Sequence, residues 1–307
     1  MAWRSLTLTQ GARLSLQAGQ VRIQRDDEDL RVPVEDLALV LLDSPEVSIT
    51  SALLSEMANR GVALLSTGGN HHPNGLFLPL TPHSRPLKVL NRQLALGRPR
   101  KKRLWQQIIQ RKLSNQAECL VLSGQERTAA VVRNLIPRVR SGDPANIEAQ
   151  GSRLYFPALF GGGFTRGADT HINSALNYGY TVVRAAIARS QVRYGLLTPI
   201  GLHHCNEQNA FNLTDDLIEP FRPVVDQHVF RHFGMYNPCT AGFDLTREDK
   251  GSLVSLLHED IDVSTQDDTT CRCTVLAAID RSTESLCRTL FMEREAVPLE
   301  LPLIVRS

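Results

Sequence analysis

Three short segments of the sequence place acidic or imidazole side chains where they could gather around a metal ion. In the first, Asp143 and Pro144 are typical of a helix start, with the aspartate as N-cap and the proline at the first helical position. Glu148 then lies near the beginning of that helix. Gly151 and Ser152 follow one turn later and leave room for a phosphate or a water molecule. Glu148 could therefore ligate a cation, although a surface carboxylate is the commoner use of such a residue.

The second segment carries two adjacent histidines, His203 and His204, after Gly201. Side chains of neighbouring residues on an extended chain point to opposite sides, so only one of the two imidazoles can face a given site. Imidazole is a common metal ligand, but an isolated histidine pair is more often structural or on the surface. This segment alone therefore leaves the identity of a ligand open.

The third segment is residues 215–223, with the sequence DDLIEPFRP. On a helix, Asp216 and Glu219 fall on one face a turn apart, which would bring two carboxylates within reach of one hard cation. An acidic first helical turn, favoured by the helix dipole, explains the same pattern. An interior proline costs roughly 3 kcal/mol, so Pro220 and Pro223 predict a helix that either begins near Pro220 or is kinked.

A strongly basic segment lies upstream of these three. Residues 85–140 contain fourteen lysines and arginines against two acids, a net charge of +12 in a chain whose total is +2. Such a block could attract the phosphate backbone of a nucleic acid, and an ordinary solvated helix face explains it equally well. The residues expected to contact DNA are Arg98, Arg100, Lys101, Lys102, Arg103, Arg111 and Lys112.

The first 80 residues predict strands that form a small sandwich or twisted sheet. Apolar residues alternate with period two at positions 6 and 8, 14 and 16, 21 and 23, and 32 and 34, which is typical of half-buried strands. The glycines at 11, 19, 68 and 69 and the acidic residues 26–29 predict turns. A helix is expected over residues 51–59, followed by a strand over residues 62–65.

The periodicity becomes helical after a predicted linker over residues 81–92. The basic segment is expected to lie on a long helix that buries Trp105. A second helix is expected from Asp169, with Asn173, Asn177 and Arg184 on one stripe and apolar residues on the other. The sequence therefore predicts an α+β protein, with a small β-rich region of residues 1–80 and a larger all-α region of residues 93–307, which carries the candidate catalytic, metal-binding and DNA-binding residues.

Composition narrows the class of protein. The chain has 307 residues, 42% of them hydrophobic, which is enough for one large core or two smaller ones. No apolar run approaches the roughly 20 residues of a membrane span, and the N-terminus lacks the features of a signal peptide. A cytoplasmic protein with no membrane partner is therefore expected. The six cysteines include no CxxC pair, so we expect reduced thiols.

The order of these motifs resembles that of a CRISPR-associated family, the near-universal integrase of spacer acquisition. The GLHH segment of residues 201–204 is similar to the family's glycine-x-x-histidine element, and the DLIEPFRP segment of residues 216–223 to its acidic, proline-rich run. Glu148 with Gly151 is similar to the family's glutamate-containing helix, and residues 173–180 to its asparagine-rich helix. The resemblance covers essentially the whole chain, and residues 209–213 look most like the variants of single-effector, type II systems.

The resemblance implies a catalytic metal site. Carried over by position, the ligands and catalytic residues are Glu148, His204 and Glu219, and Asp216 is a nearby supporting acid. The chain departs from the family pattern at His203, where many relatives have another residue, but the glycine-to-histidine spacing selects His204.

Four further residues are predicted to support this site. Asn173 and Asn177 lie in the segment that matches the asparagine-rich helix. His203 could assist the leaving group, and Arg222 could pair either with Glu219 or with a phosphate.

The ligand set and the family together suggest a mechanism and partners. Two carboxylates and an imidazole suit Mg²⁺ or Mn²⁺, which would neutralise charge in an in-line displacement at a phosphodiester. A DNA 3′-hydroxyl as nucleophile would join strands, and water would cleave them. The resemblance implies a homodimer, formed through the β-rich region, that binds a second, smaller adaptation subunit. The assembly would insert short double-stranded DNA fragments into a repeat array.

Two alternatives use the same residues differently. A repair endonuclease of branched DNA would employ the same metal site, whereas a non-enzymatic basic DNA-binding scaffold would use the acids only as helix caps. Metal-dependent strand transfer would exclude the scaffold. A requirement for a 3′-hydroxyl donor would exclude the repair enzyme.

Overall fold

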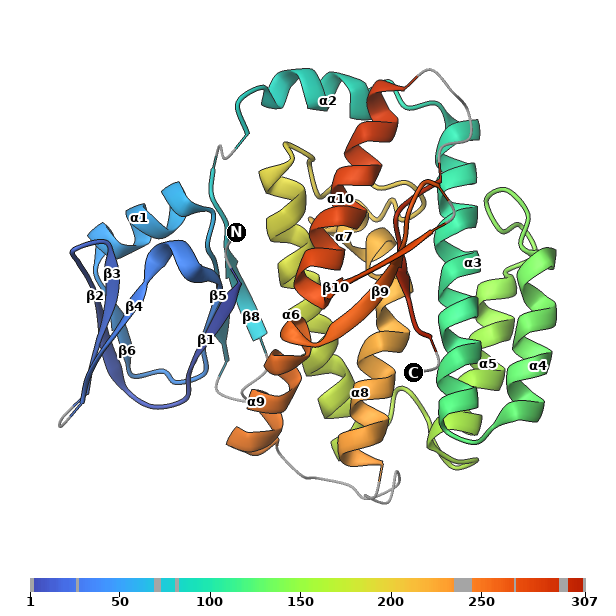
Figure 1. The fold of residues 1–307 in the computed structure, drawn as a ribbon, viewed down its shortest axis with the longest axis horizontal. Helices are drawn as coiled ribbons and strands as arrows, with labels where there is room; N and C mark the ends of the chain where they lie inside the picture. Colours follow the sequence, from blue (N-terminus) through green and yellow to red (C-terminus); the bar gives the residue numbers. More distant parts are fainter. Residues whose placement is uncertain are drawn as a thin grey trace.

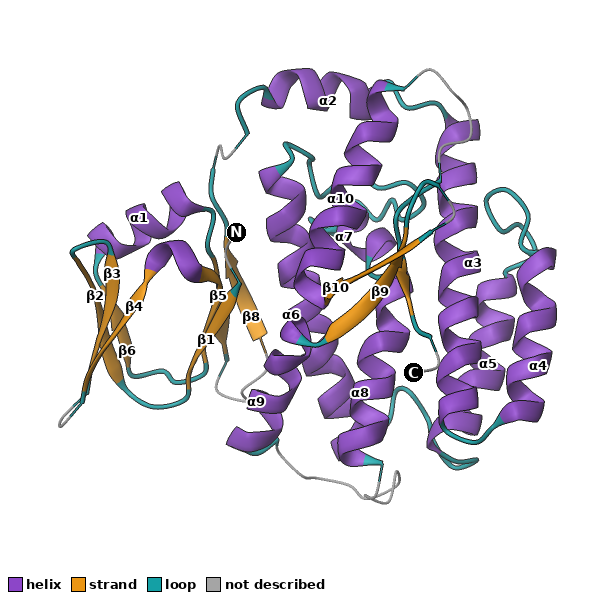
Figure 2. Cartoon of the chain, viewed as in Figure 1, coloured by secondary structure: helices purple, strands orange, loops and turns teal. Residues whose placement is uncertain are grey.

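A strand-rich N-terminal region lies beside a larger helical region (Figures 1 and 2). The computed structural model describes residues 3–25, 28–68, 73–80, 83–234, 245–267, 269–292 and 298–305. The predicted α+β class and the order of its two regions are confirmed. Part of the turns predicted at residues 26–29 and 68–69 falls outside the described residues.

Two four-stranded sheets and one helix form the N-terminal region. The first sheet contains, in spatial order, β1 (Arg4–Leu8), β5 (Leu37–Leu42), β7 (Ala63–Thr67) and β8 (Pro73–Phe77). The second contains β4 (Asp29–Pro33), β3 (Gln20–Gln24), β2 (Ala12–Gln17) and β6 (Val47–Ile49). The predicted helix is α1 (Ser51–Arg60), which ends at Gly61 because that residue adopts a left-handed conformation with φ of 69°.

The first sheet is buried on both faces. Within β5, Leu39 and Leu41 join the core of the helical region, whereas Val40 between them joins the core shared with the second sheet and α1. Side chains alternate across a strand, so a continuous apolar run such as LALVLL can fill two cores at once. The first sheet therefore links the two regions of the molecule.

Nine described α-helices follow the first sheet. Their bounds are α2 (Pro86–Leu94), α3 (Arg98–Leu122), α4 (Glu126–Leu135), α5 (Ile147–Phe160), α6 (His171–Arg193), α7 (Asn212–Leu217), α8 (Arg222–Phe233), α9 (Arg247–Ser255) and α10 (Val275–Phe291). The long helix predicted for the basic segment is α3, and Trp105 on it is buried as predicted. Short 3₁₀ turns occupy Val34–Asp36, Ile136–Arg138, Glu219–Phe221 and Leu256–His258. The predicted linker of residues 81–92 is wrong from residue 86 on, because those residues form most of α2.

The helical region also contains a sheet, which corrects the expectation that residues 93–307 are all α. Strands β10 (Thr270–Thr274), β9 (Asp260–Ser264) and β11 (Pro302–Leu303) pair in that order, and both pairings are antiparallel. These strands have five residues or fewer. The N-terminal strands are hardly longer, but there several alternating runs follow one another, whereas here an isolated pair and a two-residue strand lie among helices and give no repeated pattern.

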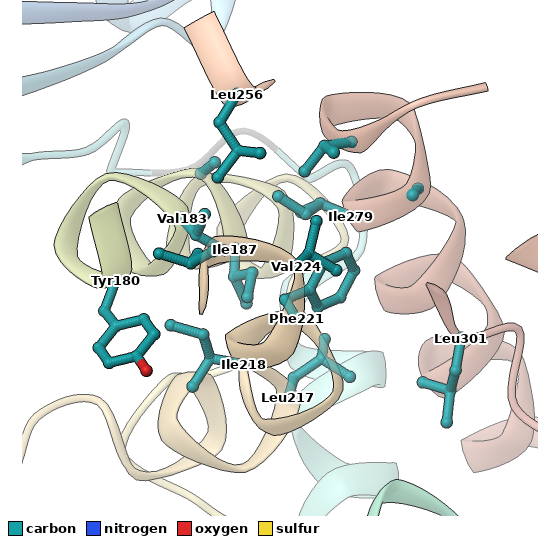
Figure 3. Packing of buried hydrophobic residues seen from close by; sticks show 14 of the residues in the cluster. Tyr180, Val183, Ile187, Leu217, Ile218, Phe221, Val224, Leu256, Ile279 and Leu301 are labelled. Carbon is teal, nitrogen blue, oxygen red and sulfur yellow. The ribbon is translucent and has the colours of Figure 1, made fainter. Parts of the chain in front are cut away.

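Helix α6 lies at the centre of the helical region and is buried along most of its length. Figure 3 shows Val183 and Ile187 of α6 among Phe221 and Val224, with Tyr180 at the edge of the cluster. Among the described residues, no helix is long and apolar enough to cross a membrane. The five described cysteines are free thiols, and Cys239 lies outside the described residues.

Candidate active site

A cavity of about 440 Å³ collects charged side chains from several elements of the helical region. Helix α3 contributes a lysine, α5 a glutamate, α6 a tyrosine, and the turn before α8 a second glutamate. The residues that line it are Lys112, Gln116, Glu148, Phe156, Arg166, Asn177, Tyr180, Glu219, Arg222 and Asp226.

The two glutamates of the predicted metal site meet at the ammonium group of Lys112. The Nζ atom of Lys112 lies 2.6 Å from Oε1 of Glu148 and 2.5 Å from Oε2 of Glu219. Lys112 was predicted to contact DNA, but it is only 6% exposed and its charge is neutralised by these acids. That assignment is wrong, because the side chain points from α3 into the protein and not to its surface.

Neighbouring charges favour the ionised forms of Glu219 and Lys112. Burial would raise the pKa of Glu219, but the positive charges of Lys112 and Arg222 lower it to about 2. Burial would likewise lower the pKa of Lys112, but the charges of Glu219 and Glu148 raise it above its ordinary value. At neutral pH the structure therefore holds two carboxylates around one cation.

The start of α5 positions Glu148. The helix begins at Ile147, and its N-cap is Asn146, whose side chain accepts a hydrogen bond from the backbone N–H of Ala149. The predicted start at Asp143 and Pro144 is therefore wrong by three residues. Asp143 still stabilises the N-terminal end of the helix, because its carboxylate accepts hydrogen bonds from the backbone N–H groups of Ile147 and Glu148.

Gly151 does not leave room for a ligand, as the sequence had suggested. A Cβ atom there would lie 2.3 Å from Cδ2 of Leu113 on α3. The glycine instead allows α3 and α5 to pack closely. This close packing brings Lys112 of α3 within reach of Glu148 of α5.

A break in the helical path positions Glu219. Helix α7 ends at Leu217, a 3₁₀ turn covers Glu219–Phe221, and α8 starts at Arg222. The interruption predicted at Pro220 thus separates two helices. Arg222 donates from Nε to Oε1 of Glu219 at 2.8 Å, which confirms the first of its two predicted roles.

Asp216 does not share a cation with Glu219, contrary to the expectation from helical spacing. Its buried carboxylate accepts hydrogen bonds from the backbone N–H groups of Leu202, His203 and His204, and it lies 2.8 Å from Nδ1 of His204. The chain curls around this carboxylate because Gly201 permits it. A Cβ atom on Gly201 would lie 2.3 Å from the carbonyl oxygen of His204.

This curl also changes the orientation of the two histidines. The ring of His203 stacks on Trp105 with 4.2 Å between centroids, and the ring of His204 meets the same indole edge-on at 5.6 Å. The expectation that the two imidazoles point to opposite sides is therefore wrong, because residues 201–204 are bent and not extended. The hydrogen bond that His204 donates to the carboxylate of Asp216 is the largest cause of a raised pKa at His204, to which the charge of Glu219 also contributes.

A buried pair that sequence reasoning missed borders the two glutamates. The hydroxyl of Tyr180 on α6 hydrogen-bonds the carboxylate of Asp226 on α8. Burial raises the pKa of Asp226 to about 6. Tyr180 stands out in the sequence only as the last residue of the asparagine-rich segment, and Asp226 carries no signal.

The two predicted supporting asparagines hold an arginine that was also missed. Arg166 donates from Nη1 to Oδ1 of Asn173 at 2.7 Å and from Nη2 to Oδ1 of Asn177 at 2.8 Å. Its guanidinium lies 5.2 Å from the centroid of the Tyr180 ring. The asparagines thus act on a side chain that lines the cavity, and do not contact the glutamates.

The remaining basic residues predicted to bind DNA lie on the first half of α3. Arg98 and Lys102 are exposed, and Arg100, Lys101, Arg103 and Arg111 are partly exposed. Lys101 donates to the carbonyl oxygen of Gly201 at 3.0 Å, and Arg100 donates to that of Thr289. The basic half of α3 therefore lies beside the segment that carries His203 and His204.

The structure thus brings Glu148 and Glu219 together, but not His204 with them. Among the described residues, no three His, Cys, Asp or Glu side chains are arranged to hold a metal ion. The carboxylates nevertheless have the chemistry of a site for a hard cation, since both approach one positive charge. The hydrogen bond of Asp216 to Nδ1 of His204 leaves Nε2 as the nitrogen that could bind a metal.

The sequence of this chain matches a known protein family and one of its members over nearly the whole chain. The family described as CRISPR associated protein Cas1 matches residues 6–253. The CRISPR-associated endonuclease Cas1 of Neisseria meningitidis serogroup C (strain 8013) is 41% identical over 305 residues, which cover 99% of this chain and 97% of the relative.

Two solved structures share the fold at low sequence identity. A casposase bound to integration product superposes with a TM-score of 0.76 at 17% identity, covering 96% of this chain and 92% of the casposase. A Cas6-RT-Cas1–Cas2 complex gives a TM-score of 0.70 at 16% identity, covering 96% of this chain and 36% of the longer one. The resemblance noted in the sequence is therefore confirmed.

Proposed function

This chain belongs to the Cas1 family of CRISPR-associated proteins, and we propose that it is a metal-dependent DNA endonuclease and integrase. It joins the 3′-hydroxyl ends of short DNA fragments into a CRISPR repeat array. The observation that carries the proposal is the convergence of Glu148 and Glu219 on one cation at the wall of a cavity. A scaffold that used its acids only as helix caps would not need both of them to converge on one buried lysine.

The proposal includes Mg²⁺ or Mn²⁺ as the cofactor. Glu148 and Glu219 supply the oxygen ligands that both ions prefer, and His204 is the proposed nitrogen ligand. Asp216 supports that role, because a carboxylate bonded to one ring nitrogen of a histidine orients the other toward a metal. The bound ion supplies electrostatic stabilisation for charge that develops on the attacked phosphodiester.

The protein's own residues prepare this site in defined ways. Arg222 fixes the orientation of Glu219 through the hydrogen bond between Nε and Oε1. Lys112 neutralises the two carboxylates, so it would have to give up contacts to them when they hold a metal ion. His203 packs on Trp105 and thereby holds the segment that carries His204.

The proposed partners follow from the family and from the surface of α3. The basic half of α3 would contact double-stranded DNA, since its charges at Arg98 and Lys102 are exposed. A homodimer joined by a second, smaller subunit is proposed because one structure that shares this fold is a complex containing Cas2. DNA joining is proposed because another is bound to an integration product.

Strand joining on a plasmid tests this function. The chain is incubated with Mn²⁺, a repeat-containing plasmid and a short duplex with 3′-hydroxyl ends, and a duplex with 3′-deoxy ends is the matched control. Joining should require the 3′-hydroxyl and the metal, and Glu148→Ala should lose it while remaining folded and able to bind DNA. Undiminished activity of Glu148→Ala in excess EDTA would exclude the metal mechanism. Cleavage without joining would favour the repair endonuclease.

A further inference from the structure

We infer that Arg166 is a phosphate-binding residue of the cavity and that Asn173 and Asn177 are the residues that position it. The inference rests on the proposed function, because it assigns the phosphate to substrate DNA. Arg166 differs from the other cations of the cavity, Lys112 and Arg222, in the charges of its hydrogen-bond partners.

The charges of Lys112 and Arg222 are already neutralised by acids. Lys112 contacts both glutamates, and Arg222 donates to Glu219. Among the described residues, no carboxylate forms an ion pair with Arg166, and both of its hydrogen bonds to side chains go to neutral amide oxygens. The guanidinium therefore keeps its positive charge available to a ligand that enters the cavity.

Several contacts hold the guanidinium of Arg166 in place. Asn173 accepts a hydrogen bond from it and also donates from Nδ2 to the carbonyl oxygens of Thr165 and Ala168, each at 2.8 Å. This amide therefore fixes the loop on both sides of Arg166. The ring of Tyr180 lies beneath the guanidinium, and the hydroxyl of that ring is held by Asp226. A surface arginine with no ligand needs no such support.

Arg184 on α6 is an arginine in similar surroundings whose charge is neutralised by an acid. Arg184 also lies over an aromatic ring, that of Phe211, and also donates to an asparagine, Asn209. Unlike Arg166, it forms an ion pair with a carboxylate, with 2.6 Å between Nε and Oδ1 of Asp215. The two sites differ mainly in this acid, which makes Arg184 a matched control.

A phosphodiester is the ligand that fits Arg166. The guanidinium has donors beyond the two bonded to asparagines, and arginine binds phosphate oxygens with paired donors. Arg166 lines the same cavity as Glu148 and Glu219, so a bound phosphate would lie beside the carboxylates. In the proposed reaction, Arg166 would thus hold substrate DNA against the catalytic groups.

The test measures DNA affinity as a function of salt in EDTA, where no metal contributes. The probe is a short DNA duplex, and the variants are Arg166→Gln, Asn177→Asp and Arg184→Gln. Each lost phosphate contact should reduce the slope of log affinity against log salt by about 0.9. Arg166→Gln should show this reduction and bind DNA roughly tenfold more weakly, and Arg184→Gln should show neither change.

The Asn177→Asp variant tests the charge of Arg166 without removing its side chain. It places a carboxylate on Arg166 in the position of the present amide oxygen, so the guanidinium stays in place but loses its available charge. We expect the same fall in slope as for Arg166→Gln, with an unchanged or higher melting temperature. A wild-type slope in both variants would overturn the assignment while leaving the proposed function intact. Failure of the wild-type chain to bind DNA would overturn the proposed function and this assignment with it.

Discussion

Two lysines at different places in the molecule are buried to the same degree but differ in the number of acids that surround them. Lys112, in the cavity of the helical region, is 6% exposed, and Lys250, where α9 meets the first sheet, is 5% exposed. Among the described residues, Lys250 pairs with one acid, Asp43 just after β5, with 2.8 Å between Nζ and Oδ2. Lys112 pairs with two acids at once.

The surroundings of the two lysines explain the difference. Around Lys250, one positive and one negative charge cancel, and Thr67 donates to the other carboxylate oxygen of Asp43 at 3.1 Å. Around Lys112, two acids and Arg222 line an open cavity, where a ligand can replace one of the charges. A buried ion pair of one acid and one base therefore holds two structural elements together. A cation that two acids share beside a cavity instead indicates a binding or catalytic site.

The largest effect should come from removing the acid that fastens the two regions. Asp43→Ala leaves Lys250 buried without its acid, which should lower the free energy of unfolding by about 3–5 kcal/mol. Glu148→Ala should cost about 1 kcal/mol or less, since Lys112 keeps its contact with Glu219. Urea denaturation of both variants measures the two values. Similar losses in both would show that the two lysines play the same role.

A smaller effect is expected at the proposed third ligand. His204→Ala should slow Mn²⁺-dependent cleavage at least about a hundredfold, or about 2.7 kcal/mol of transition-state stabilisation, because the cation loses a ligand. His203→Ala should lose less than about tenfold, because its ring packs on Trp105. Cleavage rates give the comparison, and melting temperatures show whether each variant is folded. An inactive His203→Ala beside a normal His204→Ala would move the ligand by one residue.

The smallest effect concerns competition between lysine and metal. Lys112→Met frees the carboxylates, so Mn²⁺ should bind about tenfold more tightly, or about 1.4 kcal/mol. Without metal, repulsion between Glu148 and Glu219 should lower the melting temperature, and Mn²⁺ should restore it. Titration calorimetry checks the affinity, and Lys250→Met serves as control because it should bind Mn²⁺ as the wild type does. Equal affinity in Lys112→Met and the wild type would show that ammonium and ion do not share a position.

Local patterns in the sequence predicted much of the fold. Periodicity identified the helices α1 and α3, which are long enough to repeat their pattern, and the strand-rich start, where several alternating runs separated by turn residues follow one another. Strands β9 and β10 are as long as most of those N-terminal strands but lie as an isolated pair between helices, and β11 has only two residues, so an all-α region was expected. Proline at 220 correctly marked an interruption between α7 and α8.

The site was predictable in its two glutamates and in Arg222, but not in Lys112, Arg166 or Asp226. Glu148 and Glu219 could be named from motifs, whereas Lys112 looked like any other residue of a basic block. Burial of that lysine depends on how α3 packs against α5 and on a partner 107 residues away. Asp216 was misassigned for a related reason, because the curl of residues 201–204 that engages it arises from tertiary contacts at Gly201.

The first sheet should couple the unfolding of the two regions. Its strands fill the core of the helical region with one face and the core of the second sheet with the other. Arg189 of α6 also donates to the carbonyl oxygen of Gly61 at 2.6 Å. Neither region can expose its side of the sheet to water without losing apolar burial. Heating should therefore melt the molecule in one cooperative step, and the β-rich piece should need the helical piece, supplied as a separate chain, to fold.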